Sequence, residues 1–214
     1  MKKAIIIISI LAGVVIAGFI AYSFLASSKV PQAFIDKHNE TVALGKDAEQ
    51  LSDLTSMPEM EALNKQMSNE DYSGASKSVE AAIGRKKEAD SKLSSIDSKL
   101  IELNTLSAKI SDAKIKASAD KFIDTRKKEN SAKISYNNLQ IQMLEKLKTM
   151  VDILEKNPKA ISAADEKTVN DLNKQIDDLK NQIDAAEKAV NDVQSQYKEM
   201  EKDFFGLAGL EIAK

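Results

Sequence analysis

The chain has 214 residues, of which 30% are charged and 5% aromatic; none is Cys or Trp, and one is His. The absence of Cys excludes a disulfide framework, an iron–sulfur site and a thiol nucleophile, and a single His argues against zinc. The net charge of −2 gives no general attraction to nucleic acid, so no nucleic-acid partner is expected. Seven Gly and three Pro are too few for an all-β fold, and the composition is typical of long helices.

Residues 4–26 form an uncharged run that begins AIIIISILAG. About 20 such residues cross a bilayer core as a helix. The sequence therefore predicts a single transmembrane signal-anchor within residues 1–28, and the membrane is the first expected partner.

Charges around this run indicate its orientation. Lys2 and Lys3 precede it and Lys29 follows it, which favours a cytoplasmic N-terminus and an extracytoplasmic location for residues 29–214. Two alternatives stay open. One is secretion after signal cleavage near Ser28, and the other is a reversed topology with the remainder in the cytoplasm.

A first helix is expected over residues 32–54. Pro31 disfavours a helical residue before it and so marks a joint after the apolar run. Gly45 weakens the helix, because glycine has low helix propensity. One face of this helix is apolar or small and comprises Phe34, Thr41, Leu44, Ala48 and Leu51.

A second short helix is expected after a stop-and-restart signal. Ser56 is the predicted N-cap, Pro58 lies in the first turn and Glu59 closes a capping box. The helix should end near Met67. Together the two short helices form a juxtamembrane segment over residues 29–67.

Three long helices are expected over residues 68–205. The first ends near Leu106, and its seam is apolar except for Lys86. The second runs from a cap at Asp112 to Lys156. All three are too long for a compact globular arrangement and predict an elongated shape.

The last long helix has the most regular pattern. Ser162 and Asp165 make a capping box. Apolar residues then alternate in steps of three and four over residues 169–204, a period typical of coiled-coil packing. An apolar C-terminal tail is expected over residues 206–214.

Short connections predict that neighbouring long helices run antiparallel. Residues 111–156 carry a net charge of +3 and residues 163–204 one of −5, which suits side-by-side packing. The predicted fold is therefore all-α: an antiparallel bundle of three long helices with the shorter N-terminal segment laid against it. Self-association through residues 169–204 is the alternative use of that seam.

A short motif that occurs twice suggests a candidate binding surface. The segments RKKEADSKLS at 85–94 and RKKENSAKIS at 126–135 contain both arginines of the chain. With a turn near residue 109, antiparallel packing places the two clusters at one height. Eight cations would then form a basic belt able to bind an anionic polymer: Arg85, Lys86, Lys87, Lys92, Arg126, Lys127, Lys128 and Lys133. The competing interpretation is a solvated charged face.

Other candidate chemistry is sparse. Asn130 and Asn137 lie one heptad apart, where buried amides would set helix register or line a polar cavity for a small ligand. His38 lacks partners that converge on it in the sequence, and no metalloprotease, P-loop or nucleophile-elbow motif occurs. No catalytic, cofactor-binding or metal-ligating residue is predicted.

These observations predict a non-enzymatic, membrane-anchored extracytoplasmic bundle. It would act in the cell envelope as a spacer, a scaffold or a module that binds a protein partner. The alternative is an extracytoplasmic receptor for an anionic polymer or a small ligand. The sequence assigns no family, partner or process.

Overall fold

The computed structural model describes residues 29–54, 56–157 and 161–210. Within these ranges the chain is all-helical and contains no strand, which confirms the predicted class. The helices are α1 (Gln32–Ser52), α2 (Pro58–Ser68), α3 (Tyr72–Ser107), α4 (Ala113–Lys156) and α5 (Ala163–Ala208). The predicted transmembrane segment lies outside the described residues, and none of these five helices has the length and hydropathy needed to cross a bilayer.

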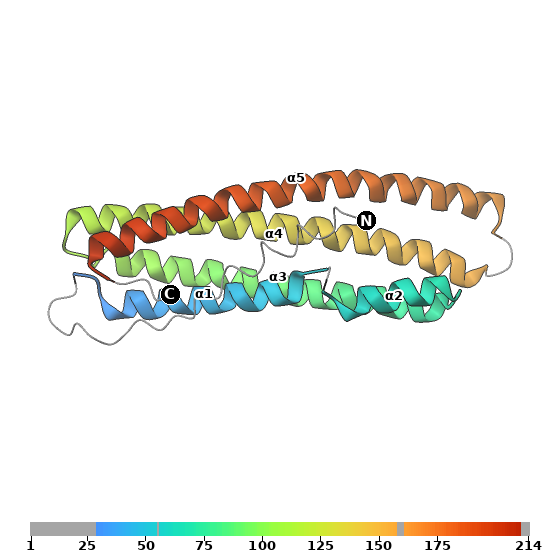
Figure 1. Cartoon of the computed structure of the whole chain (residues 1–214), viewed down its shortest axis with the longest axis horizontal. Helices are drawn as coiled ribbons and strands as arrows, with labels where there is room; N and C mark the ends of the chain where they lie inside the picture. Colours follow the sequence, from blue (N-terminus) through green and yellow to red (C-terminus); the bar gives the residue numbers. More distant parts are fainter. Residues whose placement is uncertain (1–28, 55, 158–160, 211–214) are drawn as a thin grey trace, which may run out of the picture.

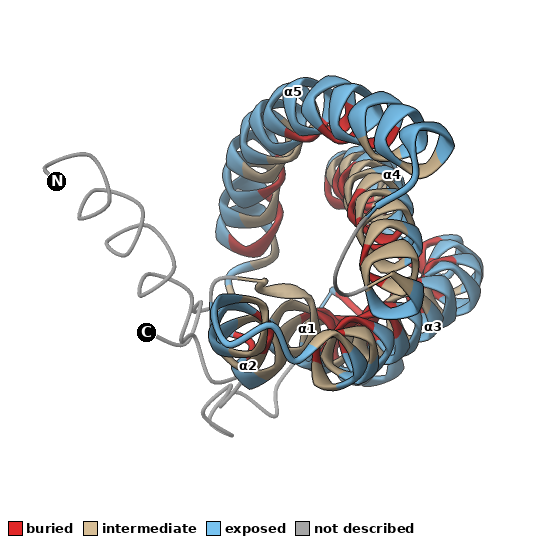
Figure 2. Ribbon diagram, turned by 90° about the vertical axis from the view of Figure 1, so that its right-hand side faces the viewer, coloured by how far each residue is buried: buried red, intermediate tan, exposed pale blue. Residues whose placement is uncertain are grey.

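The helices build a rod by running back and forth along one axis (Figure 1). α1 and α2 follow each other along one side, and both pack on α3; α3 packs on α4, and α4 packs on α5. α5 has 46 residues, so the rod is roughly 70 Å long. Seen along the axis, the helices follow an arc with buried residues on their inner sides (Figure 2).

Both ends of the described chain lie at one end of the rod, which we call the basal end (Figure 1). The turn between α3 and α4 is there too, and Lys29 bonds to Asp112 of that turn at 3.2 Å. The rings of Phe34, near the start of α1, and Phe204, near the end of α5, lie 5.3 Å apart. This contact closes the arc at the basal end.

Most helix starts follow the predicted capping signals. Asp112 accepts hydrogen bonds from the backbone N–H groups of Lys114 and Ile115. Ser162 accepts one from the N–H of Asp165, as its capping box predicts. These side chains satisfy N–H groups that have no partner within the helix.

Two predicted boundaries were wrong. α2 begins after Met57 without a side-chain cap, and the hydroxyl of Ser56 instead donates to the carbonyl of Asp53. The predicted tail at 206–214 begins too early, because α5 continues to Ala208. The helix ends where Gly209 adopts φ 68°, a left-handed conformation that glycine takes without steric cost.

The core has two apolar parts separated by a buried polar layer. The basal cluster contains all the buried phenylalanines of the described chain together with Leu93, Ile96, Leu100 and Leu103. The distal cluster contains Met57, Leu63, Ala75, Val79, Ala82, Ile83, Leu144 and Val151. The buried polar layer contains Lys86, Arg126, Glu129, Asn130, Asn137 and Gln140.

The buried face of α1 differs from the predicted one. Phe34, Thr41 and Ala48 are buried as predicted, but the face also includes His38 and Gly45, whereas Leu44 and Leu51 are only half-buried. The reason is that α1 passes over the polar layer, where small side chains allow a buried arginine to approach. A Cβ added at Gly45 would lie 2.9 Å from Nη2 of Arg126.

We expect Gly45→Ala to destabilise the protein by about 1–2 kcal/mol. Alanine has the better helix propensity, but its methyl group would displace an arginine held on several sides. The matched control is Gly84→Ala on α3, where an added Cβ meets nothing within 4 Å. That variant should gain about 0.5–1 kcal/mol. Urea unfolding checks both, and equal gains in the two variants would contradict the close packing at Gly45.

Candidate functional site

A connected set of buried charges and hydrogen bonds joins α1, α4 and α5 in the basal half of the rod. We call it the buried polar network. α4 contributes three charged side chains, and α1 and α5 supply the groups that face them. Its members are His38, Thr41, Glu49, Arg126, Glu129, Lys133, Tyr197 and Glu201.

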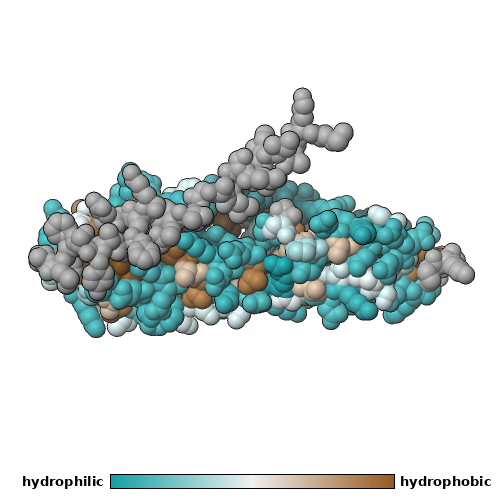
Figure 3. All heavy atoms as spheres, turned by 60° about the horizontal axis from the view of Figure 1, so that its bottom comes forward, coloured by the Kyte–Doolittle hydropathy of each residue, from teal (hydrophilic) through white to brown (hydrophobic). Residues whose placement is uncertain are grey.

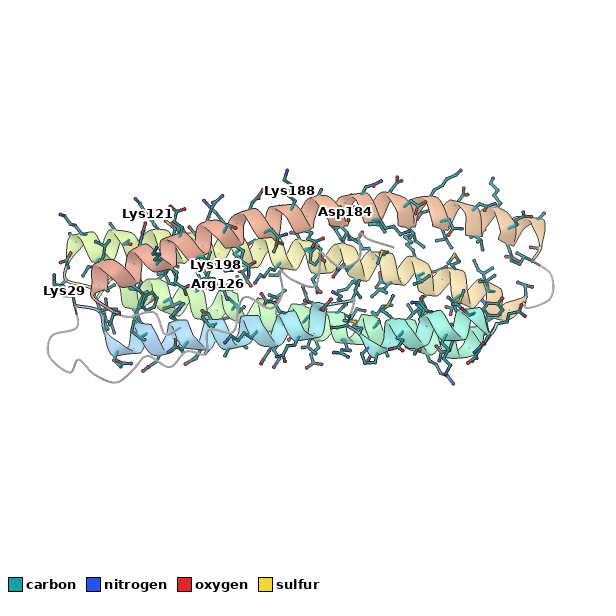
Figure 4. All side chains as sticks on the ribbon, in the orientation of Figure 1. Lys29, Lys121, Arg126, Asp184, Lys188 and Lys198 are labelled. Carbon is teal, nitrogen blue, oxygen red and sulfur yellow. The ribbon has the colours of Figure 1, made fainter. Side chains whose placement is uncertain are left out.

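Arg126 lies at the centre of the network, between α4, α5 and α1 (Figure 4). Its guanidinium pairs with Glu129 and donates to the backbone carbonyl of Thr41 at 3.2 Å. Its Cζ lies 4.8 Å from the centroid of the Tyr197 ring. One cation thus contacts three helices through an ion pair, a hydrogen bond and a cation–π interaction.

Glu129 extends the network toward α1. Its second oxygen lies 2.8 Å from Nζ of Lys133, and that ammonium lies 2.7 Å from Glu49 of α1. Burial alone would raise the pKa of Glu129. Arg126 and Lys133 outweigh that effect and hold the pKa below its ordinary value, so Glu129 is ionised at neutral pH.

On the other side, Glu201 of α5 links two further groups. It accepts a hydrogen bond from the Tyr197 hydroxyl at 2.9 Å and lies 3.1 Å from Nε2 of His38. Burial acts to raise the pKa of Glu201, but the contact with His38 and the other bonds lower it below the usual value. Burial raises the pKa of Tyr197, so its hydroxyl keeps its proton and donates.

A second polar contact lies closer to the middle of the rod. Nζ of Lys86 is buried and donates to the carbonyl of Ser52, at the end of α1, and to Gln140 of α4. The side chain of Asn137 donates to the backbone carbonyl of Lys86 at 2.9 Å. Burial lowers the pKa of Lys86 to about 7, since an ammonium group loses hydration there.

We expect Lys86→Met to increase stability at pH 6 by about 1–4 kcal/mol, because it removes a buried charge whose hydrogen-bond acceptors are a neutral backbone carbonyl and a neutral amide. The folded-state pKa of about 7 lies below the ordinary lysine value of about 10.4, so the unfolded chain binds more protons between them. Wild-type stability should therefore rise across this pH window, and the variant should lose that rise.

The control is Lys87→Met at the next position, where the side chain is 63% exposed. It should change the free energy of unfolding by less than about 0.5 kcal/mol. Urea denaturation at pH 6, 8 and 10 measures both variants. A Lys86→Met protein less stable than wild type at pH 6 would contradict this assignment.

The eight residues of the predicted basic belt do not share one surface. Lys86 and Arg126 are buried, and Lys133 is held by Glu49 and Glu129. Four of the other five residues form ion pairs: Arg85 with Glu59, Lys87 with Glu145, Lys92 with Asp47 and Lys127 with Asp124. Lys128 forms none with the residues that the structure describes. Binding of an anionic polymer stays a prediction.

The register of α3 on α4 also differs from the expected one. Asn137 lies against Lys86, and Asn130 donates to the carbonyl of Leu93 at 2.9 Å. This differs by five residues, about 1.4 helical turns, from the pairing that a turn centred on residue 109 would produce. The side chains of both asparagines on α4 donate to backbone carbonyls of α3. These contacts favour the interpretation that the asparagines set helix register over the interpretation that they line a ligand cavity.

A shallow hollow of about 330 Å³ lies between α2 and α3 and opens widely to solvent. Glu59 and Lys77 lie on its rim, and Glu59 pairs with Arg85 outside the hollow. Among the described residues, no group of three or more His, Asp or Glu is arranged to hold a metal ion. Neither Arg126 nor Glu129 lines this hollow.

Sequence reasoning missed the contribution of α1 to the network. His38 was expected to lack converging partners, and Thr41 was placed on the apolar face of its helix. In the structure they meet Glu201 and Arg126 from distant parts of the chain. One sequence signal could have indicated this contact: the small residues Thr41, Gly45 and Ala48 recur every three or four positions along one face of the helix. Their side chains are too small to fill a core, but they admit a large side chain from another helix.

Comparison of the chain with protein-family models, with curated proteins and with solved structures finds no match. The function is therefore argued from the fold and from the contacts described above.

Proposed function

We propose that this protein is a non-enzymatic, membrane-anchored helical rod. It acts outside the cytoplasm as a spacer, a scaffold or a module that binds a protein partner in the cell envelope. The observation that carries the proposal is the position of the chain ends. The described chain starts at the basal end, directly after the 23-residue uncharged run, and the rod extends about 70 Å from there.

The placement of residues 29 and 30 supports an anchored base. Val30 is buried among the apolar side chains of the basal cluster, and Lys29 is fixed to Asp112. A span that ends near residue 26 would therefore join the rod through a very short connection. Such a connection holds the distal end away from the bilayer, as a spacer or scaffold requires.

The polar interior supports a structural role rather than catalysis. Catalysis usually needs titratable groups that converge on an accessible pocket. In the described chain, Arg126, Glu129 and Tyr197 are buried, and each contacts another group of the network. They hold three helices together, which is useful in a rod that carries load or presents a surface.

Membrane fractionation with a matched pair of variants tests the anchor. The full chain should stay in the membrane pellet after alkaline carbonate extraction. Two lysines at the centre of the apolar run, Val14→Lys with Val15→Lys, should release it, because each costs about 2.5–3.5 kcal/mol in a bilayer centre. Ala164→Lys with Ala163→Lys at the distal end is the control and should leave the protein in the pellet.

The same preparation distinguishes secretion from anchoring. Intact mass measurement of the recovered protein should show residues 1–28 still attached. A soluble protein beginning near residue 29 would instead support signal cleavage near Ser28. Wild-type protein that carbonate releases with residues 1–28 attached would contradict the anchor.

Anionic-polymer binding is the weaker alternative, supported by four accessible lysines: Lys87, Lys92, Lys127 and Lys128. Gln replacement of these four should abolish co-sedimentation with an anionic glycopolymer at low salt if the alternative holds. Gln replacement of Lys167, Lys174, Lys180 and Lys188 on α5 is a charge-matched control. Binding that is unchanged by the first set would end this alternative.

A further inference from the structure

We propose that the basal end face of the rod binds the anionic headgroups of the bilayer through exposed lysines. The inference rests on the proposed membrane anchor and adds a second contact between protein and membrane. The face consists of residues 29–33, 107–116 and 206–210, which come from the start of α1, the α3–α4 turn and the end of α5. Its occupant is a lipid surface of negative charge.

The three segments of this face are packed together where the described chain begins. Phe34 of α1 contacts Phe204 of α5, and Ile110 of the α3–α4 turn is buried in the same cluster as Val30. All three segments are therefore held together around the point where the chain enters the rod. An apolar span preceding Lys29 would bring this face, and not the distal end, to the bilayer.

The charges of the face have one predominant sign. It carries Lys29, Lys109, Lys114 and Lys116 against the single acid Asp112, and Lys116 also pairs with Asp120 of the next turn. Asp112 is already engaged by Lys29 and by two backbone N–H groups of α4, which hold its pKa below the ordinary value. Lys109 and Lys114 are exposed and form no ion pair within the described part of the chain.

An apolar side chain accompanies these lysines. Leu207 in the last turn of α5 is 53% exposed and lies one turn beyond the buried Phe204. The uncovered part of the face seen in Figure 3 is largely hydrophilic with scattered apolar patches. Lysines beside an exposed leucine suit the headgroup region, where basic groups meet anionic lipid and apolar groups reach the acyl boundary.

The experiment uses the full chain in vesicles. Because the chain contains no Cys, a fluorophore can be attached at Ala108→Cys in the basal face or at Ala164→Cys at the distal end. Vesicles are phosphatidylcholine alone or with 30% phosphatidylglycerol, and both contain a lipid with a nitroxide on its headgroup. Headgroup quenching then reports how closely each end of the rod approaches the bilayer surface.

We expect the probe at position 108 to be quenched at least about two-fold more in the anionic vesicles, because Lys attraction to anionic lipid adds to tethering. The difference should shrink in high salt. Lys109→Gln with Lys114→Gln should abolish it, whereas Lys167→Gln with Lys174→Gln on distal α5 should not. The probe at position 164 should stay unquenched in both vesicles.

The outcomes separate the two proposals. A chain that fails to float with either type of vesicle would overturn the anchor and this inference together. A chain that floats, but whose probe at position 108 is quenched equally in both vesicles or regardless of the lysines, would keep the anchor. It would overturn the headgroup contact, because tethering alone then explains the proximity.

Discussion

Glu129→Gln is expected to lower the free energy of unfolding by about 3–5 kcal/mol at pH 7. Glu129 is 1% exposed and neutralises two cations, Arg126 and Lys133. Removing its charge leaves Arg126 in the interior without a carboxylate, and an unpaired buried charge is far more costly than an intact pair is favourable. Urea unfolding monitored by circular dichroism measures the loss.

The control is Glu145→Gln on the same helix. Glu145 is about half exposed and lies 3.9 Å from Lys87, so its pair is solvated and worth little. This variant should stay within about 0.5 kcal/mol of wild type. Similar losses in both variants would show that the buried polar network contributes no more than an ordinary surface pair.

The network also predicts a response to acid. The pKa values of Glu129 and Glu201 are both below the ordinary glutamate value. Each carboxylate therefore contributes stability that is complete above the unfolded-state pKa of about 4.3 and is lost as pH falls through the lowered folded-state value. Between pH 5 and 2, the free energy of unfolding should fall more in wild type than in Glu129→Gln. The variant already lacks the stability that the Glu129 carboxylate contributes.

Phe204→Ala should cost about 3–5 kcal/mol, because it empties a fully buried aromatic site. The Phe204 ring packs on Phe34 at 5.3 Å and on Phe122 at 5.5 Å, so it joins α5 to both α1 and α4. Loss of the Phe204 ring should also allow the last turns of α5 to open locally. Hydrogen exchange should show faster amide exchange in residues 197–208, while residues 172–183 stay protected.

Leu207→Ala is the matched control on the same turn of the helix. Leu207 is 53% exposed, so its truncation should change stability by less than about 0.5 kcal/mol. Equal destabilisation by the two variants would contradict the packing that closes the arc. Uniformly faster exchange along α5 in Phe204→Ala would indicate that the helix detaches as a whole.

The helices themselves were predictable because their signals are local. The end of α4 before Asn157-Pro158 and the caps at Asp112 and Ser162 depend on neighbours within four residues. The apolar seam of α5 was likewise visible, and Leu172, Ile176, Leu179 and Ile183 are buried on α4 as that seam predicts. Local capping and periodicity carry enough information for elements of this length.

The buried polar network was not predictable, because its members are distant in sequence and charged. The motif RKKE predicts a solvent-exposed helix face. Lys127 is half-exposed and Lys128 is exposed, as this prediction requires. Arg126 differs only because Gly45, 81 positions earlier, leaves room for its guanidinium. The residue pattern of α4 contains no information about the space that Gly45 leaves beside α1. The burial of the Arg126 guanidinium therefore depends on tertiary contacts alone.

The register of α3 on α4 was predicted only approximately from the sequence. The observed pairs of α3 with α4 centre between residues 111 and 112, two to three positions beyond the assumed turn centre at residue 109. In an antiparallel pair this error doubles, so every cross-helix pairing moves by five residues. Asn130 and Asn137 set the true register by donating to the carbonyls of Leu93 and Lys86.

Cysteine labelling at the distal end of the rod in intact cells is the decisive test of an anchored extracytoplasmic rod. Ala164→Cys places a single thiol at an exposed site of a chain that otherwise has none. We expect a membrane-impermeant maleimide to label this protein before lysis, and we expect the labelled protein to stay in the carbonate-washed membrane. Labelling only after lysis, or recovery of the labelled protein in the soluble fraction, would contradict an extracytoplasmic rod anchored at its base.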